Sequence, residues 1–348
     1  MFTRSLLAAA LSILLAGHAH ADNLAAIEQY GNGNTLDATQ SGTALSLTTS
    51  QIGSNNEIRS DQIGQDSDAR LTQEGEGNYQ RVYQFNTYDE YSGHHSAAID
   101  QLGTFNTAVV LQLDDAANSA SIVQDGSRHR IDVQQSVRVN NFSGYQGGTD
   151  NQALVIQEGG SRAETSQSGT DNRLTLQQTA WPFGAATVIT QTGEANTADV
   201  RQTAGGRYPG GQIELTQDGQ NNGANVVATG AWSMLDFTQA GAGNQLTVTQ
   251  SGRNTRITGT SMGDYNEADI NQTGDNNVLD LAQNGSDNLI EATQGGWWGQ
   301  GDIGTVSQTG TANFASLTQN VNVEGAATNV ASILQNGSNN SATVIQTQ

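Results

Sequence analysis

One motif recurs along nearly the whole chain and limits its fold more than any other feature. The pattern Gln-x-Gly-x-x-Asn-x5-Gln occurs in full twelve times among the 348 residues. Three degenerate copies, which start at Gln124, Gln217 and Ser261, keep the same register. The match at Gln272 lies half a unit inside the copy at Ser261, so fourteen units remain, spaced 21 to 28 residues apart. Self-similarity at this period predicts a solenoid in which each unit is one structural repeat. The complete matches start at Gln29, Gln51, Gln73, Gln101, Gln146, Gln167, Gln191, Gln239, Gln272, Gln283, Gln308 and Gln335.

Each unit divides into two arms that alternate in polarity. In the unit around Gln239, the first arm covers residues 234–239, a four-residue turn covers 240–243, and the second arm covers 244–250. Alternation with period two is typical of β-strands. The Gly that follows the first Gln of each motif suits a turn position with a positive φ. Each unit is therefore expected to be two strands joined by a short turn.

The alternation places aliphatic side chains on one face of both arms. Leu235 and Phe237 represent the first arm, and Leu246 and Val248 the second. The opposite faces carry Thr, Asp, Glu, Arg and Gln. We predict an all-β, two-sheet β-solenoid of about fourteen strand-turn-strand rungs, a rung being the two strands of one unit. Rungs stacked ~4.8 Å apart, in sheets ~10 Å apart, give a rod of roughly 65 Å.

The Gln and Asn side chains of the motif flank the aliphatic centre and point inward. A lone buried amide loses hydrogen bonds to water, whereas an amide stacked on identical amides finds both donors and acceptors, as in cross-β assemblies. We predict that these residues form stacked ladders that support the fold and self-assembly. The predicted ladder residues are Gln29, Asn34, Gln40, Gln51, Asn56, Gln62, Gln73, Asn78, Gln84, Gln101, Asn106, Gln112, Gln146, Asn151, Gln157, Gln167, Asn172, Gln178, Gln191, Asn196, Gln202, Gln239, Asn244, Gln250, Gln283, Asn288, Gln294, Gln308, Asn313, Gln319, Gln335, Asn340 and Gln346.

The first residues have the three parts of a secretory signal peptide. Arg4 is followed by an apolar run at residues 6–16 and an Ala-His-Ala cleavage pattern at residues 19–21. The run is too short to span a bilayer. We expect a signal peptide at 1–21, a repeat solenoid at 22–348 and no transmembrane segment.

The composition limits stabilising devices and partners. Hydrophobic residues make up 35% of the chain and charged residues 14%, a balance also found in disordered segments, but the regular repeat favours a solenoid. The absence of Cys excludes disulfides. Removal of the signal peptide changes the formal net charge from −21 to 12 − 34 = −22, which disfavours nucleic acid or an anionic membrane as a partner.

The repeat unit resembles the curlin repeat of bacterial curli subunits, Ser-x5-Gln-x-Gly-x-x-Asn-x5-Gln. The leading Ser is present at Ser67, Ser161 and Ser233, and Asn takes its place in four units, at Asn118, Asn140, Asn277 and Asn329. The resemblance implies secretion across the outer membrane and assembly into amyloid fibres of a biofilm matrix. It also implies other curlin-like subunits and an outer-membrane export and nucleation apparatus as partners. The chain departs from familiar curli subunits in two ways, since it has more repeat units and lacks their targeting segment before the first unit. The second departure leaves the export route open.

The two ends of the solenoid are expected to add further copies of the chain. No helical or charged cap is recognisable before the first unit or after the last one. Open strand edges template the addition of another chain, and a head-to-tail contact of this kind makes filaments. The expected partner is therefore the chain itself.

The insertions between units all follow the second arm. The main ones lie at 85–95, 181–184, 207–211, 297–301 and 321–328. The four Trp residues, which are Trp181, Trp232, Trp297 and Trp298, lie at this same edge. We interpret these aromatic side chains as packing over the bases of the loops, and the alternative is a binding edge that stacks on sugars or matrix components.

Other motifs do not indicate chemistry. His94 and His95, near Asp89 and Glu90, are expected to be solvated rather than metal ligands. The acidic pair at 114–115 lacks a facing partner for glycoside hydrolysis, and no Lys exists for a P-loop. We therefore expect no enzyme activity, no metal and no cofactor. The main hypothesis is a self-assembling extracellular fibre subunit, and the alternatives are a surface adhesin that does not polymerise and a nucleator of fibre assembly.

Overall fold

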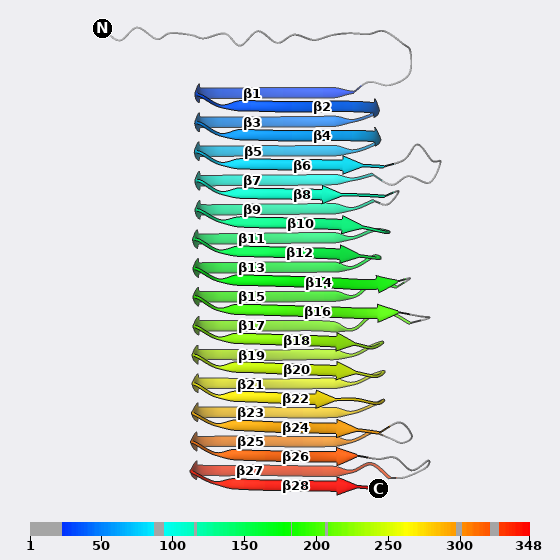
Figure 1. Cartoon of the computed structure of the whole chain (residues 1–348), viewed down its shortest axis with the longest axis vertical. Coiled ribbons are helices and arrows are strands. Elements are labelled where there is room, and N and C mark those ends of the chain that lie inside the picture. Colours follow the sequence, from blue (N-terminus) through cyan, green and yellow to red (C-terminus); the bar gives the residue numbers. More distant parts are fainter. Residues whose placement is uncertain are drawn as a thin grey trace, which may run out of the picture.

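The computed structural model describes residues 23–86, 94–114, 117–181, 183–205, 208–296, 301–320 and 327–348. Within these ranges the regular structure consists of twenty-eight β-strands in two fourteen-stranded sheets. The chain alternates between the sheets, so that odd-numbered strands form one sheet and even-numbered strands the other. Figure 1 shows the rungs following one another along the long axis of the molecule, from β1 to β28. The predicted two-sheet β-solenoid is confirmed.

The odd-numbered strands hold the first arm of each unit. Their bounds are β1 Leu24–Asn32, β3 Ser46–Ser54, β5 Asp68–Glu76, β7 Ser96–Thr104, β9 Ser119–Ser127, β11 Asn141–Thr149, β13 Arg162–Thr170, β15 Ala186–Glu194, β17 Gln212–Gln220, β19 Met234–Ala242, β21 Arg256–Asp264, β23 Val278–Ser286, β25 Ile303–Thr311 and β27 Val330–Ser338.

The even-numbered strands hold the second arm. Their bounds are β2 Thr35–Thr43, β4 Glu57–Gln65, β6 Tyr79–Phe85, β8 Thr107–Gln112, β10 Arg130–Ser136, β12 Gln152–Glu158, β14 Arg173–Trp181, β16 Thr197–Gly205, β18 Gly223–Thr229, β20 Gln245–Ser251, β22 Glu267–Gln272, β24 Leu289–Gly295, β26 Phe314–Asn320 and β28 Ser341–Thr347.

The strand register follows the repeat. Every pair of neighbouring strands is parallel and places the same motif position side by side, as in Gln29 beside Gln51 and Gly31 beside Gly53. The second arms do the same, with Gln40 beside Gln62. The insertions follow the second arms, at one edge of the solenoid, which is the right-hand edge in Figure 1. We call this the variable edge and the opposite one the tight edge.

The core is a single layer of aliphatic side chains between the sheets. Ile58 and Val82 illustrate its members, which are shielded from solvent over the length of the solenoid. Full burial of such a side chain contributes about 1.5–3 kcal/mol. Phe237 is one of the largest side chains in this layer, and Gly259 lies beside it in the next rung. A Cβ at Gly259 would lie 2.2 Å from the Phe237 ring, so the small residue makes room for the large one.

The tight turn contains two positions with positive φ, of which the sequence pattern revealed one. Gly31 has a φ of 114°, and a Cβ there would lie 1.8 Å from the carbonyl oxygen of Gly53. The second position lies two residues later, and Asn55 occupies it with a φ of 55°. Gly, Asn or Asp occupies it in nine of the fourteen units, which is the preference expected for left-handed backbone. The odd-numbered strands also extend through the first three residues of the predicted turn, because the stacked turns keep their parallel backbone hydrogen bonds.

Some predictions lie outside the described residues. These are the signal peptide at 1–21 and the cleavage point before Asp22. In the parts of the chain that the structure describes, no helix is long and apolar enough to cross a membrane.

Candidate functional site: amide ladders and the variable edge

The first Gln of each motif forms a ladder between the two sheets, which we call the first Gln column. Nε2 of Gln51 donates to Oε1 of Gln73 at 2.9 Å and to the Thr35 carbonyl oxygen of the opposite sheet at 3.0 Å. Gln29 donates to Gln51 in the same sense. Each amide therefore connects successive rungs and also connects the two sheets. Along this column, the Nε2–Oε1 distances are 2.5–3.4 Å.

The last Gln of each motif forms the second Gln column. Nε2 of Gln62 donates to Oε1 of Gln84 at 2.9 Å and to the Ser46 carbonyl oxygen across the layer at 3.0 Å. The Nε2–Oε1 distances along this column are 2.8–3.1 Å. In both columns the donor always belongs to the earlier unit and the acceptor to the later one, so the ladders have a direction.

The Asn of each motif closes the tight edge. Oδ1 of Asn34 accepts from the backbone N of Asn56 at 3.0 Å and from Nδ2 of Asn56 at 3.2 Å. Nδ2 of Asn56 also donates to the carbonyl oxygen of Gly75 in the following rung at 3.0 Å. Backbone and side chain therefore satisfy each other in a buried corner. The structure thus brings the predicted ladder residues together in three columns.

Two degenerate units interrupt the Gln columns. Ala228 stands in the second column, and Oε1 of Gln250, in the next rung, has no hydrogen bond partner there. Ser261 stands in the first column, where its hydroxyl donates to Oε1 of Gln283 at 2.6 Å. The side chain of Gln239 donates to the Gly223 carbonyl oxygen at 3.0 Å. An unpartnered buried amide atom costs stability, so the break at Ala228 is a weak point of the second Gln column.

His129 replaces Asn in one unit of the tight edge and keeps part of its role. Nδ1 of His129 accepts from the backbone N of Asn151 at 3.3 Å. Because an amide N–H can only donate, Nδ1 is unprotonated and Nε2 carries the proton. Burial lowers the pKa of His129, and nearby backbone carbonyls of Asp125 and Gly148 offset only part of this effect. Protonation of Nδ1 would place two donors against each other.

A further buried column, which was not predicted from the repeat pattern, follows the variable edge. It occupies the position of the leading Ser of the repeat. Oδ1 of Asn118 accepts from the backbone N of Asn140 at 3.0 Å, and Oδ1 of Asn140 accepts from the backbone N of Ser161 at 2.9 Å. The small polar residues at the leading position were the signal that could have revealed it. His95 belongs to this column, is fully buried, and accepts at Nδ1 from the Asn118 backbone N at 3.4 Å.

The expectation that both adjacent histidines are solvated is therefore wrong for His95. Its place in the corner of the rung, where other units have Ser or Asn, explains its burial. His94 is exposed, and its Nδ1 lies 2.9 Å from the Asp66 carbonyl oxygen. Asp89 and Glu90 lie outside the described residues. No group of three or more potential metal-binding side chains occurs within the described ranges.

Asp302 places a carboxyl group in the same variable-edge column. Its side chain is fully buried, and neither carboxylate oxygen has a hydrogen bond partner among the described residues. Burial raises the pKa of Asp302, and the nearby amides of Asn329 and Gly295 counteract only part of this rise. The ionised form of Asp302 therefore destabilises this rung.

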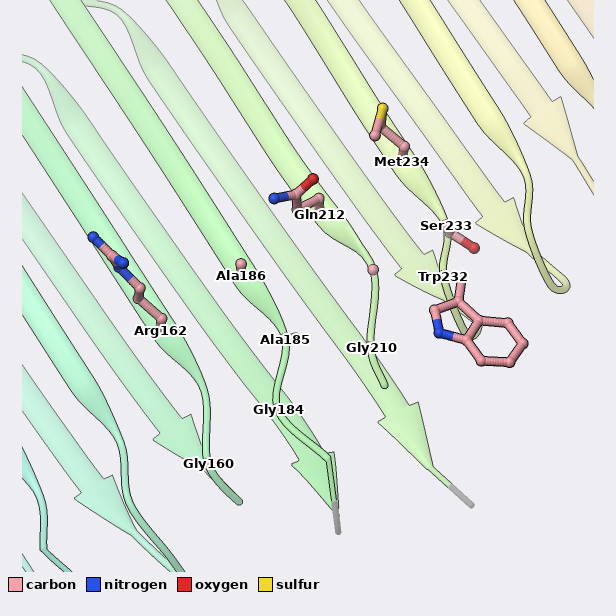
Figure 2. A pocket seen from close by; sticks show the side chains of 11 residues that line it. Gly160, Arg162, Gly184, Ala185, Ala186, Gly210, Gln212, Trp232, Ser233 and Met234 are labelled. Carbon is pink, nitrogen blue, oxygen red and sulfur yellow. The ribbon is translucent and has the colours of Figure 1, made fainter. Parts of the chain in front are cut away.

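Of the four Trp side chains at the variable edge, the structure describes that of Trp232. Trp232 is 49% exposed, and its ring lies 4.6 Å from that of Tyr208 at an interplanar angle of 49°. This contact agrees with the interpretation that aromatics pack over the loop bases. Trp181 ends β14, but its side chain lies outside the described parts, as do Trp297 and Trp298. A hollow of about 430 Å³ lies beside Trp232 (Figure 2).

The fold and the columns define a β-solenoid repeat protein stabilised by directional amide ladders. The family model described as the curlin associated repeat matches residues 42–75. This segment runs from the end of β2 through β5, and the other units stack on it in the same register. The resemblance to the curlin repeat is confirmed by this match. A comparison with curated proteins gave no match.

Proposed function

We propose that the chain is a secreted structural subunit that assembles head to tail into extracellular, curli-type amyloid fibres for adhesion and biofilm matrix. The curlin repeat and the β-solenoid fold support a structural, non-enzymatic role. The single observation that carries the proposal is the direction of the Gln columns. Apart from the breaks at Ala228 and Ser261, interior rungs are bound to their neighbours through the same Gln donors and acceptors that the outermost described rungs leave open.

The open atoms at the two ends are complementary. Oε1 of Gln29 and Oε1 of Gln40 accept no hydrogen bond from the described residues, because they precede all other members of their columns. At the other end, Gln335 and Gln346 donate to the carbonyl oxygens of Phe314 and Val330 and reach no later Gln in the described chain. A second copy that continues the register would bring these donors to those acceptors. Two equal ends would face donor to donor or acceptor to acceptor.

The strand edges favour the same arrangement. Among the described residues, no strand pairs with the outer edges of β1, β2, β27 or β28. Apolar side chains stand exposed on both terminal rungs, including Leu24 and Tyr30 at one end and Leu334 and Ile345 at the other. A junction in register would bury part of this surface and add one set of parallel backbone hydrogen bonds. The contact is open-ended, so it makes filaments rather than closed oligomers.

The test is spontaneous and seeded assembly of the mature chain, residues 22–348. We expect fibres with a meridional reflection at ~4.8 Å and with growth accelerated by sonicated fibre fragments. A monomer that persists and responds to no seed would contradict the proposal and favour an adhesin that does not polymerise. A chain that forms no fibres alone but accelerates another curlin-like subunit would instead be a nucleator. Export through an outer-membrane apparatus is part of this proposal and is tested by the location of the chain in intact cells.

A further inference from the structure

A groove crosses four rungs on the variable edge, between β13 and β19. Figure 2 shows Arg162 and Gly160 at one end, Trp232 at the other, and Gly184 and Gly210 between them. At a rung spacing of ~4.8 Å the groove is roughly 14 Å long. Its volume is about 430 Å³.

The close stacking of the backbone creates the floor of this groove. A Cβ at Gly184 would lie 1.8 Å from the Gly160 carbonyl oxygen, and a Cβ at Gly210 would lie 2.7 Å from the Cβ of Ala185. Side chains are therefore excluded from the floor, and peptide groups form it. Ala186 contributes only a methyl group beside it. The larger side chains of Arg162 and Trp232 then stand as walls.

A second hollow of about 150 Å³ continues the groove onto the outer face of β15, β17 and β19. The two hollows share Ala186, Gln212 and Met234, and the second adds the carboxylates of Glu214 and Asp236. Along its length, the combined groove presents the amide of Gln212, the carboxylate acceptors of Glu214 and Asp236, and the apolar wall formed by Trp232. Arg162 adds a donor, since its side chain is 74% exposed and its guanidinium lies 3.9 Å from the nearest oxygen of Glu164.

Trp232 is presented by a backbone conformation that disfavours it. Its φ is 55°, in the left-handed region that bulky residues rarely adopt. Asn254 and Asn276 occupy the same position in the next two rungs, with φ values of 56° and 62°. The backbone N of Trp232 donates to the Pro209 carbonyl oxygen at 3.2 Å, which fixes the turn. The Trp232 ring therefore stands beside the groove at the expense of a backbone conformation that costs stability.

We propose that this groove binds a neutral saccharide chain. The exposed indole face suits the apolar C–H face of a sugar ring. Sugar hydroxyls both donate and accept, which matches the acceptors Glu214 and Asp236, the donor Arg162, and Gln212, which is both. The formal net charge of −21 and the absence of Lys disfavour an anionic polymer. The site is independent of fibre assembly, because its walls come from interior rungs.

The test is calorimetric titration of the mature chain with defined hexasaccharides. The neutral probes are cellohexaose, fully N-acetylated chitohexaose and maltohexaose, and hexagalacturonate is the anionic probe. We expect one of the neutral probes to bind. We expect Trp232→Asn to weaken that binding at least tenfold, which is about 1.4 kcal/mol. Because Asn suits the left-handed position, this variant keeps or raises the thermal stability. Ala186→Arg, which fills the groove from its side, should also abolish binding.

The matched control is Tyr265→Asn. Tyr265 is an exposed aromatic residue with a φ of 56°. It lies in the turn between β21 and β22 on the tight edge, and the groove lies on the opposite, variable edge. This variant should bind the probe like the unmodified chain, and all variants should still form fibres. Binding to none of the neutral probes, equal affinity for hexagalacturonate, or full binding by Trp232→Asn would each overturn the proposal.

Discussion

Replacing Gln135 with Ala removes one amide from the interior of the second Gln column. Nε2 of Gln135 donates to Oε1 of Gln157 at 2.9 Å and to the Ser119 carbonyl oxygen at 2.9 Å. Nε2 of Gln112 donates to Oε1 of Gln135 at 2.9 Å. After the substitution, Oε1 of Gln157 has lost the donor from the preceding rung. Gln112 keeps its bonds to two backbone carbonyl oxygens.

The magnitude follows from the unpartnered acceptor and the emptied space. A buried acceptor without a partner costs about 1–3 kcal/mol. The volume left by the longer side chain adds about 1–2 kcal/mol. We expect Gln135→Ala to lower the free energy of unfolding by about 2–5 kcal/mol, as the sum of these two ranges.

The neighbouring Gln134 provides the control, since it lies on the same strand with its side chain exposed on the outer face. Gln134→Ala should change the free energy of unfolding by less than about 0.5 kcal/mol. Urea unfolding at protein concentrations too low for assembly measures both variants. Equal effects of the two substitutions, or a loss below about 0.5 kcal/mol for Gln135→Ala, would refute the reasoning that buried ladders stabilise the fold.

The interrupted and titratable positions give three further predictions. Ala228→Gln should raise the free energy of unfolding by about 1–3 kcal/mol, because it supplies a donor to the unpartnered Oε1 of Gln250; an unchanged urea midpoint would contradict this. The pKa of His129 is lowered in the folded chain, so its contribution to stability is complete above the unfolded pKa of about 6.5 and declines below it. His129→Asn should therefore lose less stability than the unmodified chain between pH 7 and pH 5, as melting temperatures can show. The pKa of Asp302 is raised, so Asp302 favours the folded chain at low pH and destabilises it as the carboxyl group ionises. Asp302→Asn should therefore raise the melting temperature at pH 7, with a smaller gain at pH 3. A gain that does not depend on pH would contradict this.

The period of the motif was sufficient to predict the fold and most of the ladders. Fourteen motifs in one register require equivalent residues to stack, and alternation decides which of them face inward. The positions of Gln51, Asn56 and Gln62 in three columns follow from these two facts alone. Even the gap at Ala228 was visible as a departure from the motif.

The variable edge was harder to predict because it depends on how turns stack and not on alternation. The leading position varies among Ser, Asn and other residues, so the burial of His95 and Asp302 is hidden in a weak pattern. The left-handed backbone conformation of Trp232 was equally hard to predict from the sequence, since Asn occupies the equivalent position in only some of the units. The groove beside it arises from glycines whose role becomes clear once adjacent backbones are seen in contact.

Oxidative crosslinking within fibres tests head-to-tail assembly most directly, because the chain contains no Cys. Continuation of the strand register beyond β28 places Ser341 of one copy beside Thr35 of the next. Parallel neighbours ~4.8 Å apart are within the range that a disulfide can span. Fibres grown from a mixture of the Thr35→Cys chain and the Ser341→Cys chain should form covalent dimers, whereas fibres of either chain alone should not. Dimers in fibres of a single variant, or none in the mixture, would contradict assembly through the open ends of the ladders.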